Sequence, residues 1–392
     1  MAAPFANHQN EIYFRGAGGE RPPFTTDLAG IEEAARAVLD PQAFGYVAGS
    51  AGTGSTARAN RAAFERWRIV PRLLCDVSER DLSTTVLGTP MPAPVLLAPI
   101  GVQSIVHPDG ELASARAATA TGLVFIHSTA AAHSIEEVAE ASGDGSRWYQ
   151  LYWPKERDVA ASLVGRAEAA GFAALVVTLD TFMLGWRPTD LDTAYLPFLQ
   201  GIGIANYLTD PAFNAPLPDD AADVDKVFRW AGMFGNPSLT WRDLAWLREQ
   251  TALPIVLKGV LHPDDARAAL DAGVDGLVVS NHGGRQIDGA VAALDALPTV
   301  LDAVEGRIPV LLDSGVRTGA DVVKAVALGA SAVLYGRPYV YGLGLGGQAG
   351  VEHVLRCLLG ETDVTMALSG RRSLAELGPD LLVTDPVARL DG

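Results

Sequence analysis

The sequence predicts an α/β protein built as a (β/α)8 TIM barrel. From residue 94 onward, eight short apolar runs alternate with alanine-rich segments of helical spacing, and glycine or proline stands at most of the joints. The apolar runs are continuous, which is typical of parallel strands that are covered on both faces. Eight strand-then-helix units favour a closed barrel. A doubly wound open sheet is the alternative, but no G-x-G-x-x-G turn follows the first predicted strand.

The elements of this barrel can be assigned in order along the chain. The predicted strands are Pro94–Ala98, Val124–His127, Trp148–Leu151, Leu175–Leu179, Ile255–Lys258, Leu277–Ser280, Val310–Asp313 and Ala332–Tyr335. The predicted helices are Glu111–Thr121, Ile135–Ala141, Asp158–Ala170, Trp241–Thr251, Pro263–Ala272, Leu294–Val304 and Gly319–Leu328. One connection, residues 181–239, is far longer than the others. Its prolines, glycines and aromatic residues predict a partly ordered lid loop after the fourth strand.

The first part of the chain, residues 1–90, is predicted to form an N-terminal arm and a helical segment that pack on the barrel domain, residues 91–392. Residues 1–27 are rich in glycine, proline and charge and have no period, which predicts an irregular arm. Residues 28–39 have helical spacing. The glycine-rich run of residues 44–56 is interpreted as a flexible linker, because no Gly-Lys-Ser/Thr follows to make it a phosphate loop.

Composition excludes several classes of partner. The formal net charge of −16 argues against a nucleic-acid or anionic membrane surface. No apolar run approaches the ~20 residues of a membrane span, and the N-terminus lacks a signal-peptide pattern. The two cysteines, Cys75 and Cys357, have neither C-x-x-C nor metal-ligand spacing, and no other set of His, Cys and Asp has it. A reduced, cytoplasmic protein without a metal site is therefore expected.

The carboxyl ends of barrel strands carry the active site in this architecture. Polar, cationic and turn residues gather there: Pro99, Gly101, Ser128, Gln150, Tyr152, Thr178, Asp180, Lys258, Ser280, His282, Arg285, Asp313, Ser314, Arg317, Gly336 and Arg337. The glycine and arginine turns after the seventh and eighth strands predict a phosphate site, because backbone N–H groups, a helix start and guanidinium groups meet there.

The chemistry of this rim suggests acid–base catalysis on an organic anion. His282 is the candidate general base, and Asp180 could orient it. Arg285, and Arg187 at the root of the long loop, offer forks for a carboxylate. Lys258 would either form a Schiff base or stabilise charge on an electron-rich ring. An aldolase and a non-enzymatic barrel that binds an anion remain alternatives at this point.

The run Ser280-Asn281-His282-Gly283-Gly284-Arg285-Gln286 resembles the signature of the FMN-dependent α-hydroxy-acid oxidases and dehydrogenases. The resemblance extends from about residue 43 to about residue 376. It includes Tyr46, Ala98-Pro99-Ile100-Gly101, Gln150-Leu151-Tyr152, Thr178-Leu179-Asp180, Lys258-Gly259, Asp313-Ser314-Gly315-Val316-Arg317 and Gly336-Arg337-Pro338. Against this family pattern, Ala130 stands where an aromatic residue is common, and Gly101 stands where alanine is common.

The resemblance implies a role for each matching residue. FMN would be bound by Pro99, Ile100, Gly101, Ser128, Gln150, Thr178, Lys258, Ser280, Asp313, Ser314, Gly315, Arg317, Gly336 and Arg337. The catalytic group would be His282, Asp180, Tyr152 and Lys258, with Lys258 stabilising the reduced flavin in place of the Schiff-base role. The substrate would be bound by Tyr46, Tyr152, Arg187, His282 and Arg285. Hydride transfer and a carbanion route both remain open.

Within the family, the likeness is strongest to the L-lactate 2-monooxygenases. It rests on Asn10–Tyr13 and on three parts of the long loop, Gly185–Pro188, Pro197–Leu199 and Asn206–Pro211. This branch converts lactate and O2 to acetate, CO2 and water. An oxidase that releases the keto acid and H2O2, or a dehydrogenase with another acceptor, is the alternative. The family also implies a homo-oligomer, a tetramer or an octamer.

Overall fold

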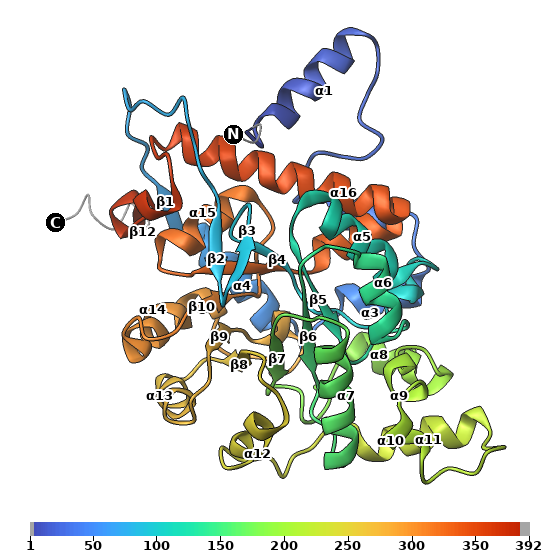
Figure 1. Ribbon diagram of the computed structural model, residues 1–392. Helices are drawn as coiled ribbons and strands as arrows, with labels where there is room; N and C mark the ends of the chain where they lie inside the picture. Colours follow the sequence, from blue (N-terminus) through green and yellow to red (C-terminus); the bar gives the residue numbers. More distant parts are fainter. Residues whose placement is uncertain (1–3, 385–392) are drawn as a thin grey trace.

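The computed structural model describes residues 4–384; the outermost parts of the predicted arm and barrel domain, residues 1–3 and 385–392, lie outside this range. Its centre is a closed barrel of parallel strands in the order β10-β11-β4-β5-β6-β7-β8-β9, which confirms the predicted (β/α)8 fold (Figure 1). The strands are β4 (Val95–Leu97), β5 (Val124–Ser128), β6 (Arg147–Leu151), β7 (Leu175–Thr178), β8 (Ile255–Val260), β9 (Gly276–Val279), β10 (Val310–Leu312) and β11 (Ala332–Tyr335). Each lies within two residues of its predicted bounds.

An outer layer of helices surrounds the barrel. It comprises α5 (Gly110–Thr121), α6 (Ile135–Ser142), α7 (Arg157–Ala169), α12 (Asp243–Gln250), α13 (Pro263–Asp271), α14 (Ala293–Val304), α15 (Gly319–Ala327) and α16 (Arg337–Leu368). The first seven were predicted. The long α16 was not, because its first half is rich in glycine and its backbone is non-helical at Gly346 and Gly347. In the described residues, no helix is both long and apolar enough to cross a membrane.

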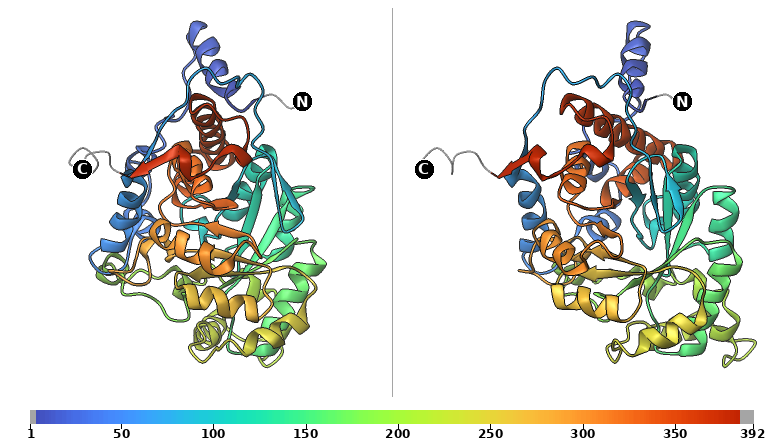
Figure 2. Two further views of the ribbon diagram at one scale, coloured as in Figure 1. Left: turned by 90° about the vertical axis from the view of Figure 1, so that its left-hand side faces the viewer. Right: turned by 60° about the vertical axis from the view of Figure 1, so that its left-hand side comes forward.

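The arm contains more structure than the sequence predicted. Helix α1 (Asn7–Ala17) lies in the part expected to be irregular, and Figures 1 and 2 show it projecting from the body beyond α16. Helix α2 (Ile31–Arg36) falls within the predicted helical segment and buries Ile31 and Ala35. Helix α1 was missed because it lacks the apolar stripe by which a surface helix is usually recognised in a sequence. In the described part of the chain, none of the residues of α1 is buried.

The interpretation of residues 44–56 as a flexible linker was wrong. Helix α3 (Pro41–Ala48) occupies its first half, and α4 (Ser55–Arg66) begins at its end. Asp40 caps α3 by accepting hydrogen bonds from two backbone N–H groups, at 2.9 and 3.1 Å, and the proline follows at the first helical position. The glycines serve the tight turn between the two helices. This turn places α3 and its Tyr46 at the barrel mouth.

The barrel interior is filled and closed at its amino end. Its side chains form a core of their own, separate from the core between strands and helices, with Leu96, Ile126 and Val176 fully buried. A hairpin of β2 (Thr84–Val86) and β3 (Thr89–Met91) contributes to this interior core. A second small sheet pairs β1 (Trp67–Ile69) with β12 (Leu382–Thr384).

The connection after β7, residues 181–239, is hereafter called the β7–α12 segment. It contains α8 (Pro188–Asp192), η2 (Pro197–Gln200), α9 (Ala205–Leu208), α10 (Pro211–Asn214) and α11 (Asp223–Met233). Aromatic residues hold these short elements together: the rings of Phe198 and Trp230 stack at 4.8 Å, and Tyr207 and Phe213 meet edge to face at 5.6 Å. The segment is thus packed into a layer next to the strand ends.

Candidate active site

A cavity opens at the carboxyl ends of the strands. All five predicted substrate contacts line it: Tyr46, Tyr152, Arg187, His282 and Arg285. Ten predicted cofactor contacts also line it: Pro99, Ile100, Gly101, Lys258, Asp313, Ser314, Gly315, Arg317, Gly336 and Arg337. The other four, Ser128, Gln150, Thr178 and Ser280, are buried but do not line the cavity. The structure therefore brings the predicted residues together, and their individual roles stay predictions.

His282 is held by its Nδ1 side. Nδ1 lies 2.9 Å from Oδ1 of Asp180 and 3.2 Å from Oγ1 of Thr181, while Nε2 lies 3.5 Å from the hydroxyl of Tyr152. Burial lowers the pKa of His282 below its ordinary value, although the Asp180 carboxylate opposes this. A neutral imidazole whose Nδ1 carries the proton toward Asp180 presents a free base at Nε2.

Asp180 and Lys258 are charged partners beneath the cavity. Burial alone would raise the pKa of Asp180, but its interactions with His282, Lys258 and Thr181 outweigh burial and lower the pKa. Burial would likewise lower the pKa of Lys258, but Asp313, 2.9 Å from its Nζ, and Asp180 raise it above the ordinary value. Lys258 therefore stays protonated, which argues against the Schiff-base role because only a neutral amine attacks a carbonyl.

The turn that carries His282 has a strained backbone. His282 has φ 58° and Ser314, in the neighbouring β10 turn, has φ 71°, a region that costs a non-glycine residue about 1–3 kcal/mol. Serine hydroxyls hold the conformation: Oγ of Ser280 accepts from the His282 N–H at 3.0 Å, and Oγ of Ser314 accepts from the Gly283 N–H at 2.9 Å. The imidazole of His282 is thus fixed by its backbone as well as by Asp180.

Helix α4 locks the same turn from outside. The amides of Asn60 and Asn281 exchange two buried hydrogen bonds, at 2.8 and 2.7 Å. Oδ1 of Asn281 also accepts from the Gly284 N–H at 3.1 Å. Because both amides are buried and mutually satisfied, α4 and the turn after β9 form one rigid unit.

A cluster of buried cations faces His282. The guanidinium carbon of Arg285 lies 5.2 Å from the centre of the Tyr46 ring, and Nε of Arg187 donates to the Arg285 carbonyl at 3.0 Å. Burial, and then the charge of Arg187, lower the pKa of Arg285 to about 9. Two guanidinium groups that disfavour each other's charge would both be stabilised by a carboxylate between them.

The residues present fit FMN. Nε2 of Gln150 is buried and has no hydrogen-bond partner among the described residues, while its Oε1 accepts from Oγ of Ser128 at 2.8 Å. An unsatisfied buried N–H suits a carbonyl oxygen on the edge of a flavin ring. At the far end of the cavity, the turn before α15 offers Gly315, with φ 108°, and Arg317 to a phosphate.

Arg337, at the start of α16, has partners within the chain. Its guanidinium donates to the backbone carbonyls of Val47, Gly283 and Gly49, at 3.0, 3.0 and 2.9 Å. It therefore ties the turn after α3 to the turn after β9, and it also lines the cavity. This second task was not visible in the sequence, because it depends on where the turn after α3 lies.

Some lining residues were missed by the sequence analysis. Thr181 was overlooked although it directly follows Asp180 at the end of β7, a position that could have identified it. Phe198 and Phe234 come from the β7–α12 segment and line the cavity without any local sequence signal. Ala130 and Gly101 meet at the rim, where a Cβ added to Gly101 would overlap the Ala130 carbonyl oxygen.

The comparisons define the class. The family model described as FMN-dependent dehydrogenase matches residues 35–384. The chain belongs to this family of FMN-dependent oxidoreductases, and it acts on 2-hydroxy acids with FMN as its cofactor. The sequence-based resemblance is thereby confirmed.

Among curated proteins, the chain is 44% identical to an FMN-dependent alpha-hydroxy acid dehydrogenase of Penicillium citrinum, and the match covers 96% of each chain. It is 45% identical to an L-lactate oxidase of Lysinibacillus sphaericus, over 92% of this chain and 93% of the relative. Among solved structures, a mandelate oxidase superposes with a TM-score of 0.81 at 40% identity, covering 92% of this chain and 99% of the other.

Proposed function

We propose that the protein is an L-lactate 2-monooxygenase, which converts L-lactate and O2 to acetate, CO2 and water. The observation that carries this proposal is the aromatic wall that the β7–α12 segment adds to the site. The base His282 and the arginine pair share one cavity, and the β7–α12 segment adds Phe198 and Phe234 to its wall. A site that holds a small keto acid after oxidation needs such a wall, because the product must stay while oxygen reacts.

The substrate carboxylate would bind between Arg187 and Arg285, with the Tyr46 hydroxyl beside them. Arg187 is buried, with 6% exposure, and Arg285 is half-buried, so that their attraction for an anion is only partly screened by water. This placement would direct the 2-hydroxyl toward Nε2 of His282 and the hydroxyl of Tyr152. A small substrate side chain such as methyl would fit beside Phe198 and Phe234, which form the wall of the cavity on this side.

His282 would take a proton from the substrate at Nε2. The Asp180 carboxylate then stabilises the imidazolium through Nδ1, as in other histidine–carboxylate pairs. Gln150, Lys258 and the phosphate turns would hold FMN, which would supply the acceptor for the two electrons. Lys258, protonated beside Asp313, would offer a fixed positive charge to the reduced cofactor.

A simple oxidase or a dehydrogenase is the second candidate. It is favoured by the names of the relatives, which include L-lactate oxidase and FMN-dependent alpha-hydroxy acid dehydrogenase. Both share the first half-reaction and the same residues. They differ only in the fate of the keto acid and in the electron acceptor.

Anaerobic mixing with L-lactate, followed by admission of oxygen and product analysis, separates these candidates. A monooxygenase loses its yellow colour and then gives acetate and CO2 with little free peroxide. Pyruvate with stoichiometric peroxide would identify an oxidase, and slow recovery of colour in air would identify a dehydrogenase. D-lactate is the matched control, because it cannot place its Cα–H and its carboxylate correctly at once. Loss of colour with a bulkier 2-hydroxy acid only would shift the substrate class and overturn the lactate assignment.

A further inference from the structure

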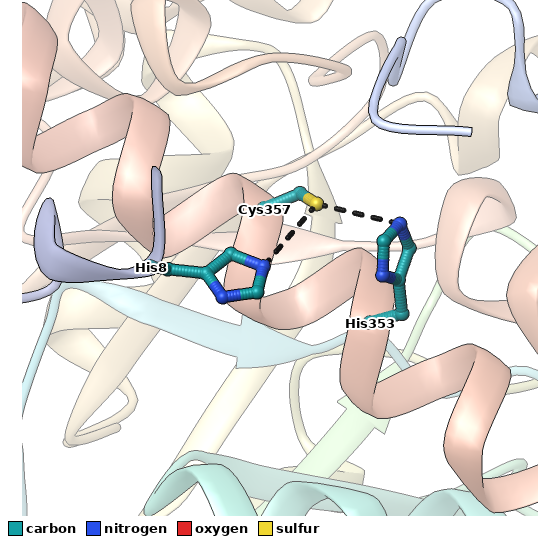
Figure 3. A group of neighbouring side chains, drawn as sticks. All are labelled: His8, His353 and Cys357. Carbon is teal, nitrogen blue, oxygen red and sulfur yellow. Dashed lines mark hydrogen bonds between the residues drawn. The ribbon is translucent and has the colours of Figure 1, made fainter. Parts of the chain in front are cut away.

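Three side chains outside the active site converge on one point. His8 comes from α1, and His353 and Cys357 come from α16; Figure 3 shows both rings turned toward the sulfur. Sγ of Cys357 lies 3.8 Å from Nε2 of His8 and 3.6 Å from Nε2 of His353. The sequence analysis did not single out this group, because His8 lies far from Cys357 in the sequence. His353 and Cys357 are four residues apart on one helix and therefore share a face.

The distances suit a tetrahedral cation. With Zn–S near 2.3 Å and Zn–N near 2.0–2.1 Å, tetrahedral geometry places a sulfur and a nitrogen ligand about 3.5 Å apart. The two observed S···N distances, 3.6 and 3.8 Å, need only a small contraction. All three ligand atoms lie within 4.8 Å of one another. One thiolate and two imidazoles are ligands that a borderline-soft divalent cation prefers over hard cations.

The surroundings resemble the outer shell of a metal site. Nδ1 of His8 lies 3.6 Å from a carboxylate oxygen of Glu11, which is itself paired with Arg356 at 2.7 Å. The separation of 3.6 Å is too long for a hydrogen bond, and Nδ1 of His8 has no hydrogen-bond partner among the described residues. A small rotation of the ring toward Glu11 would give the imidazole the carboxylate support that is typical of metal ligands. Nε2 of His353 lies 2.9 Å from the Thr25 carbonyl oxygen, so that a cation would replace this hydrogen bond. Water or this carbonyl oxygen would fill the fourth position.

We propose that His8, His353 and Cys357 form a Zn2+ site that fastens α1 to α16. On binding, the Cys357 thiol releases its proton to solvent and ligates as thiolate. Helix α1 lacks a hydrophobic anchor, since its Tyr13 and Phe14 are 67% and 79% exposed. None of the three ligands lines the catalytic cavity, so FMN binding and turnover should not depend on the cation.

The first test uses the full-length FMN-loaded enzyme, treated with a chelator and dialysed against Zn2+. We expect one zinc per chain. Cys357→Ala and His8→Ala should each weaken binding at least about 100-fold, since even outer-shell partners cost 10–100-fold. Cys75→Ala is the matched control, because Cys75 is exposed and outside the cluster; it should bind like the wild type. Flavin absorbance verifies the fold of each variant. A wild-type chain that binds no zinc, or a Cys357→Ala chain that binds it equally, overturns the proposal.

Cobalt substitution and proteolysis supply readouts that ordinary packing would not move. Co2+ should give the thiolate charge-transfer and tetrahedral d–d bands, both absent in Cys357→Ala. Zn2+ should slow tryptic cleavage after Arg15, which lies in α1, in the wild type and not in Cys357→Ala. If the chain binds zinc but its cobalt form lacks the thiolate band, the cation lies elsewhere and the assignment is overturned. The same conclusion would follow if zinc did not protect Arg15 from cleavage.

Discussion

The turn after β9, residues 280–286, and the β7–α12 segment both shape the cavity, but they are held in different ways. The turn is fixed by buried polar contacts: Ser280 and Ser314 hold its backbone, and Asn60 holds Asn281. The segment is held by ring packing and by a few polar contacts, such as those of Asn206 to the Ser128 and Thr129 carbonyls, and it leaves Trp186 74% exposed. From this comparison we expect the proposed chemistry to depend on a rigid turn, and the proposed retention of the product to depend on a segment with more exposed parts.

The largest effect should come from the rigid turn itself. His282→Ala removes the base at Nε2, and general-base catalysis contributes about 10²–10⁴-fold. We expect anaerobic flavin reduction by L-lactate to slow by at least about 1000-fold, while FMN stays bound. Stopped-flow absorbance measures the rate. The substitution Trp186→Ala, at an exposed site in the segment, is the control and should reduce normally. A His282→Ala enzyme within tenfold of the wild type would remove His282 from the mechanism.

Asp180→Asn tests the support of that base. The pKa of His282 lies below its ordinary 6.5, so reduction should be constant at neutral pH and fall only as pH drops through this lowered pKa. Asp180 raises the pKa of His282, so removing its charge moves the falling limb to still lower pH. The plateau should drop about 10–100-fold, because the imidazolium loses its counter-charge. A falling limb that moves to higher pH would contradict this assignment. Rates of reduction across pH 4–9 would decide, a range chosen to be about 2 units either side of the ordinary pKa.

Breaking the contact between α4 and the turn after β9 should have a smaller effect than removing the base His282. Asn60→Ala leaves the buried Asn281 amide without its partner, which costs about 1–3 kcal/mol of unfolding free energy. Asn214→Ala in the segment is the matched control: its amide donates to two backbone carbonyls near the surface, and we expect a smaller loss. Denaturant unfolding followed by flavin fluorescence gives both values. Equal losses would mean that the turn is no more rigid than the segment.

The repeated strand and helix units of the barrel were predictable from the sequence. The features that depend on long-range contacts were not. The barrel strands follow from local apolar runs and their punctuation, and the strand ends then place Lys258, His282 and Asp313 on one rim. Helix α3 was missed because its cap, Asp40, lies outside the glycine-rich run that suggested a linker. Asn60 gave no signal, since its partner is far away in sequence.

The β7–α12 segment was also only partly predictable from the sequence. Its length predicted a covering role, but spacing could not show which aromatic residues would reach the cavity. Phe234 lines the cavity while its ring packs at a tilt against that of Trp230, one helical turn earlier, at 4.7 Å between ring centres. The cluster of His8 with Cys357 was hidden for a similar reason: the two residues are brought together only by the docking of α1 on α16.

The smallest effect on rate, and the sharpest on product, should come from Phe234→Ala. Phe234 lies edge to face with Tyr152 at 5.3 Å, so that its removal opens the wall beside the base without touching it. Flavin reduction should stay within about threefold of the wild type, because no group acting in that step is lost. Pyruvate and free peroxide should rise at the expense of acetate, since an opened wall lets the keto acid leave before oxygen reacts. Phe228 is 68% exposed on α11, the helix that Phe234 directly follows, and Phe228→Ala should leave the product ratio unchanged. An unchanged ratio in Phe234→Ala would mean that the segment does not retain the product, and the argument from the aromatic wall for a monooxygenase would then fail even if the catalytic turn behaves as described.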